Sequence, residues 1–111
     1  MSEFLFLFRG SQQSLRSPEQ MQRSFEKWRA WFGDLQQKGI LKNPTPLEPG
    51  GKLVQGRAKD VHDGPYAEIK DLINGYVLIE AATIDKAVEL SKDCPIFNDG
   101  GSIEIRPVLK L

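Results

Sequence analysis

The pattern of hydrophobic and polar residues along the chain predicts two helices and four or five strands. Residues 3–9 form a short apolar run rich in Phe that ends at Arg9-Gly10, which is typical of a strand. Because strand side chains alternate, Phe4, Phe6 and Phe8 share one face and Leu5 and Leu7 share the other. Both faces are apolar, so we expect one to be covered by helices and the other by a second subunit.

Residues 17–39 predict a long helix. Ser17 is a suitable N-cap, Pro18 fits the first helical position, and Gly39 can end the helix after about Lys38. The apolar positions recur at spacings of three and four, which predicts one buried face. The members of this face are Met21, Phe25, Trp28, Phe32 and Leu35, with Trp31 beside them.

Proline and glycine divide the middle of the chain. Residues 43–51 contain three X-Pro pairs and Gly-Gly, so we expect a loop there. Two short extended pieces, 52–55 and 58–62, follow with Gly56 between them, and they are consistent with a hairpin. A turn at Asn74-Gly75 should then lead into a strand at 76–82 that is apolar on both faces.

The last third of the chain predicts a second helix and a final strand. Thr83 can cap a helix at 84–93, which Pro95 would prevent from continuing. Its inner face should consist of Ile84, Ala87, Val88 and Ser91. After a turn at 98–101, residues 102–108 alternate between apolar and polar positions, as a half-exposed strand does.

This order of elements predicts an α+β fold in a single domain, residues 1–111. The natural packing is a ferredoxin-like βαββαβ subunit with both helices on one face of an antiparallel sheet. The other, apolar face would then drive homodimerisation.

Composition narrows the classes of function. The 15 basic residues balance the 15 acidic ones, so no net field favours nucleic acid or a membrane surface. One Cys and one His cannot supply an ordinary zinc site, and we expect no metal and no cofactor. No basic, long apolar leader and no run of about 18 apolar residues is present, so the cytoplasm is the expected location.

The stretch 62–71 holds the densest polar chemistry in the chain and also its most recognisable motif. Asp63-Gly64-Pro65-Tyr66 resembles the Asp-Gly-Pro-Phe signature of the DGPF-domain branch of the YCII-related family. The remaining features follow in family order: a Phe/Leu-rich first strand, a Pro-started helix ending at Gly39, Glu68 and Lys70, Gly75-Tyr76, and the final Gly-Gly-Ser-Ile-Glu-Ile-Arg-Pro-Val at 100–108. The resemblance therefore covers nearly the whole chain.

That resemblance implies a ferredoxin-like subunit that assembles into a dimeric α+β barrel. Some DGPF members lie beside or within genes for extracytoplasmic-function sigma factors. In some members of the wider family, a His-Asp pair is thought to be a catalytic dyad, with the His soon after the first strand. This chain departs from that pattern, because the region reads Arg9-Gly10-Ser11-Gln12-Gln13.

Asp63 and His62 are the best candidates for catalytic groups. Asp63 could accept a ligand proton, although an Asp before Gly-Pro more commonly accepts backbone N–H bonds within the turn. His62 is the only imidazole, with a pKa range suited to acid–base work. Adjacent strand residues point to opposite faces, however, so these two side chains meet only if the turn bends them together.

Several neighbours could bind a ligand beside Gly64 and Pro65. Arg9 ends an apolar strand, where it could hold an anion or simply seal the strand end. Glu68 and Lys70 lie two residues apart and could share a ligand or form a solvated ion pair. Tyr66 could stack on a ligand or fill the space beneath the turn.

Two functions follow from these residues. The first is a small dimeric ligand-binding or regulatory protein with a cleft bordered by residues 62–70. The alternative is a lyase- or isomerase-type enzyme that uses Asp63 with His62 or Arg9. A small organic molecule is the expected ligand in both cases.

Overall fold

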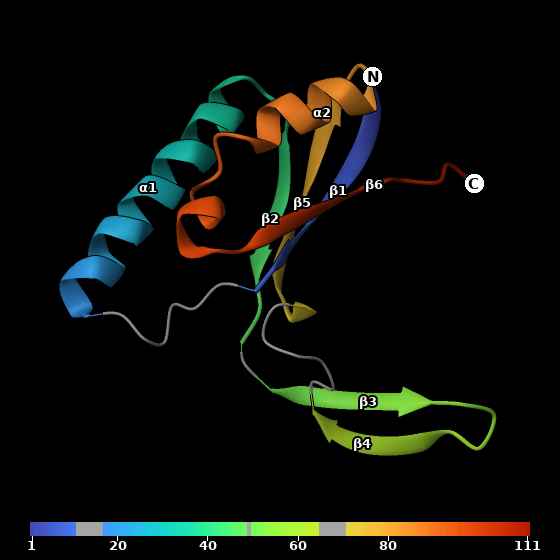
Figure 1. Cartoon of the computed structure of the whole chain (residues 1–111). Helices are drawn as coiled ribbons and strands as arrows, with labels where there is room; N and C mark the ends of the chain where they lie inside the picture. The colour runs from blue at the N-terminus through green and yellow to red at the C-terminus, as the bar shows by residue number, and fades with distance from the viewer. Residues whose placement is uncertain (11–16, 49, 65–70) are drawn as a thin grey trace.

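A computed structural model of the chain describes residues 1–10, 17–48, 50–64 and 71–111. Two helices lie on one face of a four-stranded antiparallel sheet, and a two-stranded hairpin extends from one end of that sheet (Figure 1). The helices are α1 (Pro18–Gln37) and α2 (Ile84–Ser91), followed by a short 3-10 helix, η3 (Pro95–Asp99). The strands of the main sheet are β1 (Ser2–Arg9), β2 (Leu41–Pro46), β5 (Ile73–Ala81) and β6 (Ser102–Pro107).

The strand order of the main sheet is β2-β5-β1-β6. Strands β1 and β5 occupy the centre, and every neighbouring pair is antiparallel. With α1 between β1 and β2 and α2 between β5 and β6, this is the ferredoxin-like arrangement. The predicted α+β fold class is therefore confirmed.

The hydrophobic core lies between the helices and the facing side of the two central strands. Phe4, Phe6 and Phe8 of β1 are all buried, as the alternation predicted. They meet Leu35 and Trp31 of α1 and buried residues of β5. The ring of Trp28 stands edge-on to Phe8, with centroids 5.1 Å apart and planes at 89°, a favourable aromatic geometry.

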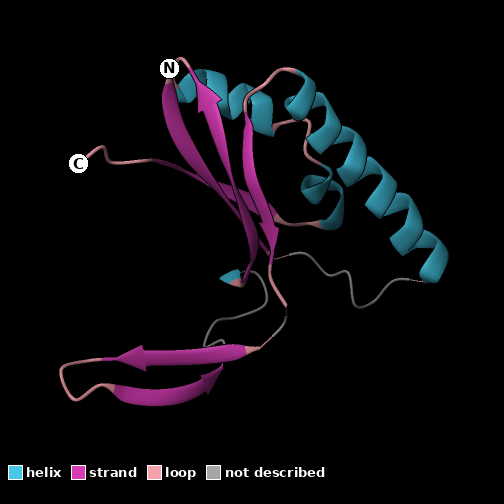
Figure 2. Ribbon diagram, turned by 180° about the vertical axis from the view of Figure 1, so that it is seen from behind, coloured by secondary structure: helices cyan, strands magenta, loops and turns pink. Residues whose placement is uncertain are grey.

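Helix α1 begins and ends as predicted, but only part of its apolar face is buried. The hydroxyl of Ser17 accepts the Gln20 amide at 3.2 Å, and the Gln20 side chain accepts the Ser17 amide at 3.0 Å. Met21 and Phe25, however, are 49% and 59% exposed, so their assignment to the core face was wrong. The amino-terminal half of α1 lies away from the sheet (Figures 1 and 2), so these side chains do not reach the core.

The expectation of a loop over 43–51 was wrong for residues 43–46, which belong to strand β2, and for Gly51, which begins β3. Strand β2 is an edge strand, where Pro44 removes no donor that a neighbour needs. A register shift between Lys42 and Thr45, with Asn43 at a φ of 49°, forms a bulge around that proline. The proline-rich sequence therefore interrupts the pairing of an edge strand without preventing the strand.

Asn74 and Gly75 lie inside β5 and do not form the predicted turn. Glycine is needed at 75 because of close packing: a Cβ there would lie 2.8 Å from the carbonyl oxygen of Thr45 on β2. The Asn-Gly pair therefore reflects the close approach of two strands rather than a chain reversal.

The second helix is shorter than predicted, and a further element follows it. Thr83 caps α2 as expected, but the helix ends at Ser91 instead of residue 93. Ala87 and Ser91 are buried, whereas Ile84 and Val88 are exposed, because eight residues provide only a narrow buried stripe. The chain then forms η3, which starts at Pro95 and was not predicted.

The predicted hairpin exists as β3 (Gly51–Gln55) and β4 (Asp60–Gly64), joined by a turn in which Gly56 and Lys59 have positive φ. The second strand starts at residue 60, later than the expected 58. The hairpin forms its own two-stranded sheet, with Gly51 opposite Gly64 and Val54 opposite Val61.

The side of the main sheet that faces away from the helices is also apolar at its centre. In the register of β1 and β5, Leu5 pairs with Leu78 and Leu7 pairs with Tyr76. All four side chains remain partly exposed. We refer to this surface, Leu5, Leu7, Tyr76 and Leu78, as the open face.

Candidate functional site

The candidate site is built around the end of β1, where Arg9 connects three parts of the fold. Its Nη2 donates to Oε1 of Glu104 on β6 at 2.8 Å. Its Nη1 donates to the carbonyl oxygen of Asp71, just before β5, at 3.0 Å. Within the described part of the chain, the buried Nε of Arg9 meets no hydrogen-bond partner. The guanidinium is thus held in place by two hydrogen bonds.

Main-chain contacts bring further segments to this end of the sheet. The amide of Gly10 donates to the carbonyl oxygen of Leu72 at 3.0 Å. Gly101, at the start of β6, lies so close to Arg9 that an added Cβ would be 2.7 Å from the Arg9 carbonyl oxygen. The amide of Gly101 also donates to the Ile96 carbonyl oxygen of η3 at 3.0 Å. The end of β1, the entry to β5 and η3 therefore meet at one corner of the fold.

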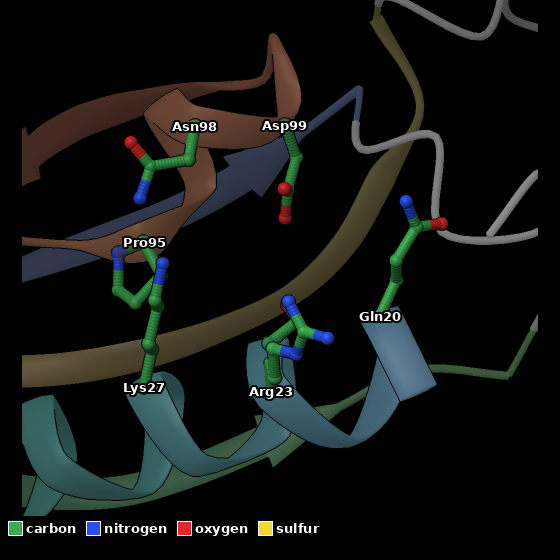
Figure 3. Close-up of a pocket in the computed structure, with 7 residues that line it drawn as sticks. Gln20, Arg23, Lys27, Pro95, Asn98 and Asp99 are labelled. Atoms are coloured by element: carbon green, nitrogen blue, oxygen red, sulfur yellow. The ribbon is translucent and has the colours of Figure 1, made fainter. Parts of the chain in front are cut away.

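An open cleft of about 240 Å³ lies at this corner, between η3 and the first half of α1. Figure 3 shows side chains of α1 directed across the cleft toward η3. The residues that line it are Gln20, Arg23, Ser24 and Lys27 on one side and Pro95, Asn98 and Asp99 on the other. We refer to it as the α1–η3 cleft.

The lining of the cleft is polar and carries both signs of charge. Arg23 and Lys27 are one helical turn apart on α1 and so present two cations to the same side. Asn98 and Asp99 provide an amide and a carboxylate opposite them. Such a set can bind an anionic oxygen with the cations while hydrogen-bonding a hydroxyl group with the carboxylate or amide.

The two predicted acid–base residues lie on the hairpin. Asp63 is on β4, and its side chain is 91% exposed and ion-paired with Lys52 at 2.6 Å. His62 is half-buried and pairs across the hairpin with Leu53, whereas Asp63 pairs with Lys52. Because adjacent strand residues point to opposite faces, the hairpin does not direct His62 and Asp63 into a common site.

Of the other predicted ligand-binding residues, the structure describes Gly64 and Arg9. Gly64 is the last residue of β4, and Arg9 occupies the corner described above. No hydrogen bond or ion pair joins Asp63 to Arg9 within the described residues, since each has its own partner. Pro65, Tyr66, Glu68 and Lys70 lie outside the described residues.

Reasoning from the sequence missed the residues of the α1–η3 cleft. Asn98 and Asp99 fall in the predicted turn at 98–101, and Arg23 and Lys27 lie outside the predicted apolar face of the first helix. The four-residue spacing of the two cations was a signal that they share a side of α1. That η3 lies opposite them follows only from the tertiary fold.

Burial accounts for the state of the single cysteine. Cys94 is 3% exposed and caps η3. Desolvation raises the pKa of its thiol to about 12, outweighing a backbone hydrogen bond at Ile96 that lowers it. The thiol is therefore protonated at neutral pH, which makes it a poor nucleophile.

Two kinds of site are absent from the part of the chain that the structure describes. Residues 1–10, 17–48, 50–64 and 71–111 contain no group of three or more His, Cys, Asp or Glu side chains positioned to hold a metal ion. Within the same ranges, no helix has the length and apolar character needed to cross a membrane.

Comparison with known proteins agrees with this architecture. An uncharacterized protein of Rhizobium meliloti strain 1021 is 41% identical over 49 residues, which is 43% of this chain and 40% of that protein's length. The solved structure of a 5-chloro-2-hydroxyhydroquinone dehydrochlorinase from Burkholderia phenoliruptrix AC1100, in complex with 2,5-dihydroxybenzoquinone, aligns with a TM-score of 0.54. It is 16% identical, covers 97% of this chain and 93% of its own, and shows a shared fold. The model of the YCII-related domain matches residues 2–111, and the chain belongs to that family.

Proposed function

We propose that this protein is a cytoplasmic homodimer that binds a small organic acid and has a regulatory rather than a catalytic role. The proposed binding site is the α1–η3 cleft, and Arg9 on the other side of the sheet is a second candidate binding group. The observation that carries the proposal is the pair of cations, Arg23 and Lys27, facing Asn98 and Asp99 across a cleft of about 240 Å³.

The chemistry of the cleft suggests the class of ligand. Two neighbouring cations favour a carboxylate or another acidic oxygen through charge-assisted hydrogen bonds. Asp99 would repel a second acidic group but would accept a hydrogen bond from a hydroxyl group. The volume is below the roughly 300 Å³ at which pockets for drug-sized molecules begin, so a single ring or a short chain fits best. A hydroxylated aromatic or aliphatic acid meets all three conditions.

Arg9 is a second candidate binding group, at the end of β1. Its hydrogen bond to the Asp71 carbonyl oxygen fixes the point where the chain re-enters the sheet after the motif. Its hydrogen bond to Glu104 on β6 holds the guanidinium in place from the other side. Because strand side chains alternate, the Arg9 side chain lies on the same side of the sheet as Leu5 and Leu7, so it borders the open face and not the α1–η3 cleft.

A binding role fits the reactive groups better than catalysis does. The thiol of Cys94 is buried and protonated. The carboxylate of Asp63 is exposed and paired with Lys52, without a base or nucleophile joined to it by hydrogen bonds in the described residues. These features favour recognition of a ligand over its conversion.

The proposed dimer rests on the open face. Leu5, Leu7, Tyr76 and Leu78 form adjacent apolar positions on the two central strands, and neither helix lies over them. Contiguous partly exposed apolar side chains at the centre of a sheet are typical of a surface that associates. Light scattering should therefore give a dimer at micromolar concentration, and a monomer would contradict this part of the proposal.

Isothermal titration calorimetry can test the ligand-binding role. We would titrate salicylate, 2,5-dihydroxybenzoate and 2,5-dihydroxybenzoquinone into the full chain. At least one should bind, and the double variant Arg23→Ala/Lys27→Ala should weaken its binding at least tenfold. Lys38→Ala, at the other end of the same helix, should bind as the unchanged chain does. Absence of binding by every compound, or equal binding by the double variant, would contradict the proposal.

An enzymatic role is the second candidate, and the comparison with the dehydrochlorinase favours it. That enzyme shares the fold, and loss of HCl from a ring is an elimination, the reaction class of a lyase. In this chain, the enzyme would use Asp63 together with His62 or Arg9 as acid–base or anchoring groups.

Turnover distinguishes the two candidates. If the chain is such an enzyme, one of the compounds or a chlorinated analogue should change its absorbance spectrum over time. Asp63→Asn should abolish that change while Lys52→Gln, which removes only the ion-pair partner, should retain most of it. A ligand that binds without any spectral change over hours would exclude this alternative for that compound.

A further inference from the structure

The β3–β4 hairpin stands outside the core of the protein. None of its residues is buried, and Val54 and Val61, which pair with each other, are 60% and 61% exposed. A two-stranded hairpin is only marginally stable in water by itself. An exposed valine pair in such an element indicates a surface that is covered in the assembled protein.

The hairpin and the open face lie on the same side of the subunit, which limits the surfaces that could cover the hairpin. Figures 1 and 2 both show the hairpin extending away from the helix layer, toward the side on which the open face lies. The radius of gyration is 15.4 Å, compared with about 13 Å for a typical compact domain of 100 residues. The subunit therefore has a concave, L-like outline, with the open face and the hairpin on the same side.

We infer that the β3–β4 hairpin is a dimer arm that packs its Val54–Val61 pair against a second copy of this chain. The inference rests on the dimer proposed above, in which the open faces of two copies meet. It goes beyond that dimer by assigning a function to the hairpin and by naming its partner surface, the end of the partner subunit's sheet.

The length of the arm supports this assignment. Two sheets that pack face to face lie about 10 Å apart. Each hairpin strand has five residues, so at about 3.4 Å per residue the arm is roughly 17 Å long. An arm of that length on the side of the open face extends past the neighbouring sheet. Contact with the partner subunit is therefore difficult to avoid once the open faces meet.

Symmetry favours a second copy over an unrelated protein. In a two-fold dimer, the same surface patch of each subunit forms the interface, so any contact that one subunit makes to its partner is also made in return. Because the arm and the open face lie on one side of the subunit, a single two-fold axis lets both arms reach a partner at once. An unrelated partner would have to be complementary to both the open face and the hairpin. A second copy of this chain brings a matching pair of the same two surfaces.

A deletion can test the arm. Gly51 and Gly64 pair across the hairpin, and paired residues lie about 5 Å apart, so removing residues 52–63 and joining these two glycines should leave the sheet unchanged. We expect sedimentation equilibrium to give a dimer for the full chain and a dissociation constant at least tenfold higher for the deletion variant. The helical circular dichroism signal of the two proteins should be the same.

The possible results separate the two proposals. A full chain that remains monomeric at all concentrations would overturn both the dimer and the arm. A deletion variant with an unchanged dissociation constant would overturn the arm while the dimer stands.

Cross-linking provides a second test that does not depend on how the deletion variant folds. We would attach a benzophenone maleimide to Val54→Cys in ¹⁴N chains and mix them with ¹⁵N chains that carry no label. Cross-linked peptides should join ¹⁴N and ¹⁵N segments. The same label on Gln36→Cys, on the helix side, should give no such pairs. Cross-links found only within single chains would overturn the inference. The absence of any cross-link in a protein that is shown to be dimeric would also overturn it.

Discussion

Gly101 and Arg9 are in direct main-chain contact: a Cβ at position 101 would lie 2.7 Å from the carbonyl oxygen of Arg9. This contact brings the start of β6 against the end of β1. It also helps to position η3, which forms one wall of the α1–η3 cleft. The corner that we propose as a binding region therefore depends on one residue without a side chain.

Gly101→Ala should destabilise the protein by about 1–3 kcal/mol, because the added methyl group would clash with the Arg9 carbonyl oxygen and with the buried side chain of Ile96. Gly33→Ala is the matched control. Gly33 lies on the exposed side of α1 with no atom within 4 Å of an added Cβ, so alanine should stabilise the helix by about 0.5–1 kcal/mol. Guanidinium unfolding of both variants checks the prediction, which fails if the two changes have the same sign.

Leu35→Ala and Met21→Ala should differ sharply although both residues belong to one sequence stripe of α1. Leu35 is almost fully buried, so its truncation should cost about 2–5 kcal/mol. Met21 is about half exposed at the end of the helix far from the sheet, and its truncation should change stability by less than about 0.5 kcal/mol. Unfolding midpoints in urea measure both, and a large effect at Met21 would indicate that the residue is covered in solution.

Lys42 and Glu80 should make stability depend on pH at both extremes. Their side chains lie 2.6 Å apart, and this hydrogen bond is the main cause of the lowered pKa of Glu80 and the raised pKa of Lys42. The carboxylate's contribution is present above the ordinary value of 4.5 and is lost as pH falls through its lowered pKa. The contribution of Lys42 is present below 10.5 and is lost as pH rises through its raised pKa.

The variant Glu80→Gln tests this dependence. It should melt at a lower temperature than the unchanged chain near neutral pH, and the difference should close as the solution is acidified below 4.5. Glu3 contacts Lys42 at 3.3 Å and should retain part of the interaction, so the effect will be small. A melting difference that persists unchanged at pH 2 would show that the ion pair is not its cause.

Cys94 should not react with thiol reagents while the protein is folded. Burial raises the pKa of its thiol to about 12, so almost no thiolate is present at pH 8. We expect no release of colour from 5,5′-dithiobis(2-nitrobenzoate) until guanidinium is added, and then one equivalent per chain. The exposed Gln36→Cys variant serves as the positive control, and rapid stoichiometric labelling of the folded unchanged chain would contradict the prediction.

Much of the fold could be read from the sequence because local physics specifies it. The alternation of Phe and Leu in residues 3–9 determines which side of β1 is buried. The Ser17-Pro18 start and Gly39 stop define α1 within one or two residues. The order of the elements then leaves the ferredoxin-like arrangement as the natural packing.

Tertiary structure decided the features that depend on neighbours distant in the sequence. Pro44 could remain in a strand only because β2 lies at the edge of the sheet, and Gly75 is required only because β2 passes close to it. Met21 and Phe25 share the periodicity of Leu35, but the tilt of α1 leaves them without a sheet to pack against.

The candidate site shows the same division. The amino-acid sequence showed which residue types were available, including Arg9 at a strand end and the polar stretch around Asp63. Only the tertiary structure brought Arg23 and Lys27 opposite Asn98 and Asp99, some 70 residues later in the chain, and placed Asp63 on a projecting hairpin. Side-chain periodicity records which face of an element is apolar, whereas a cleft forms where two separate elements meet.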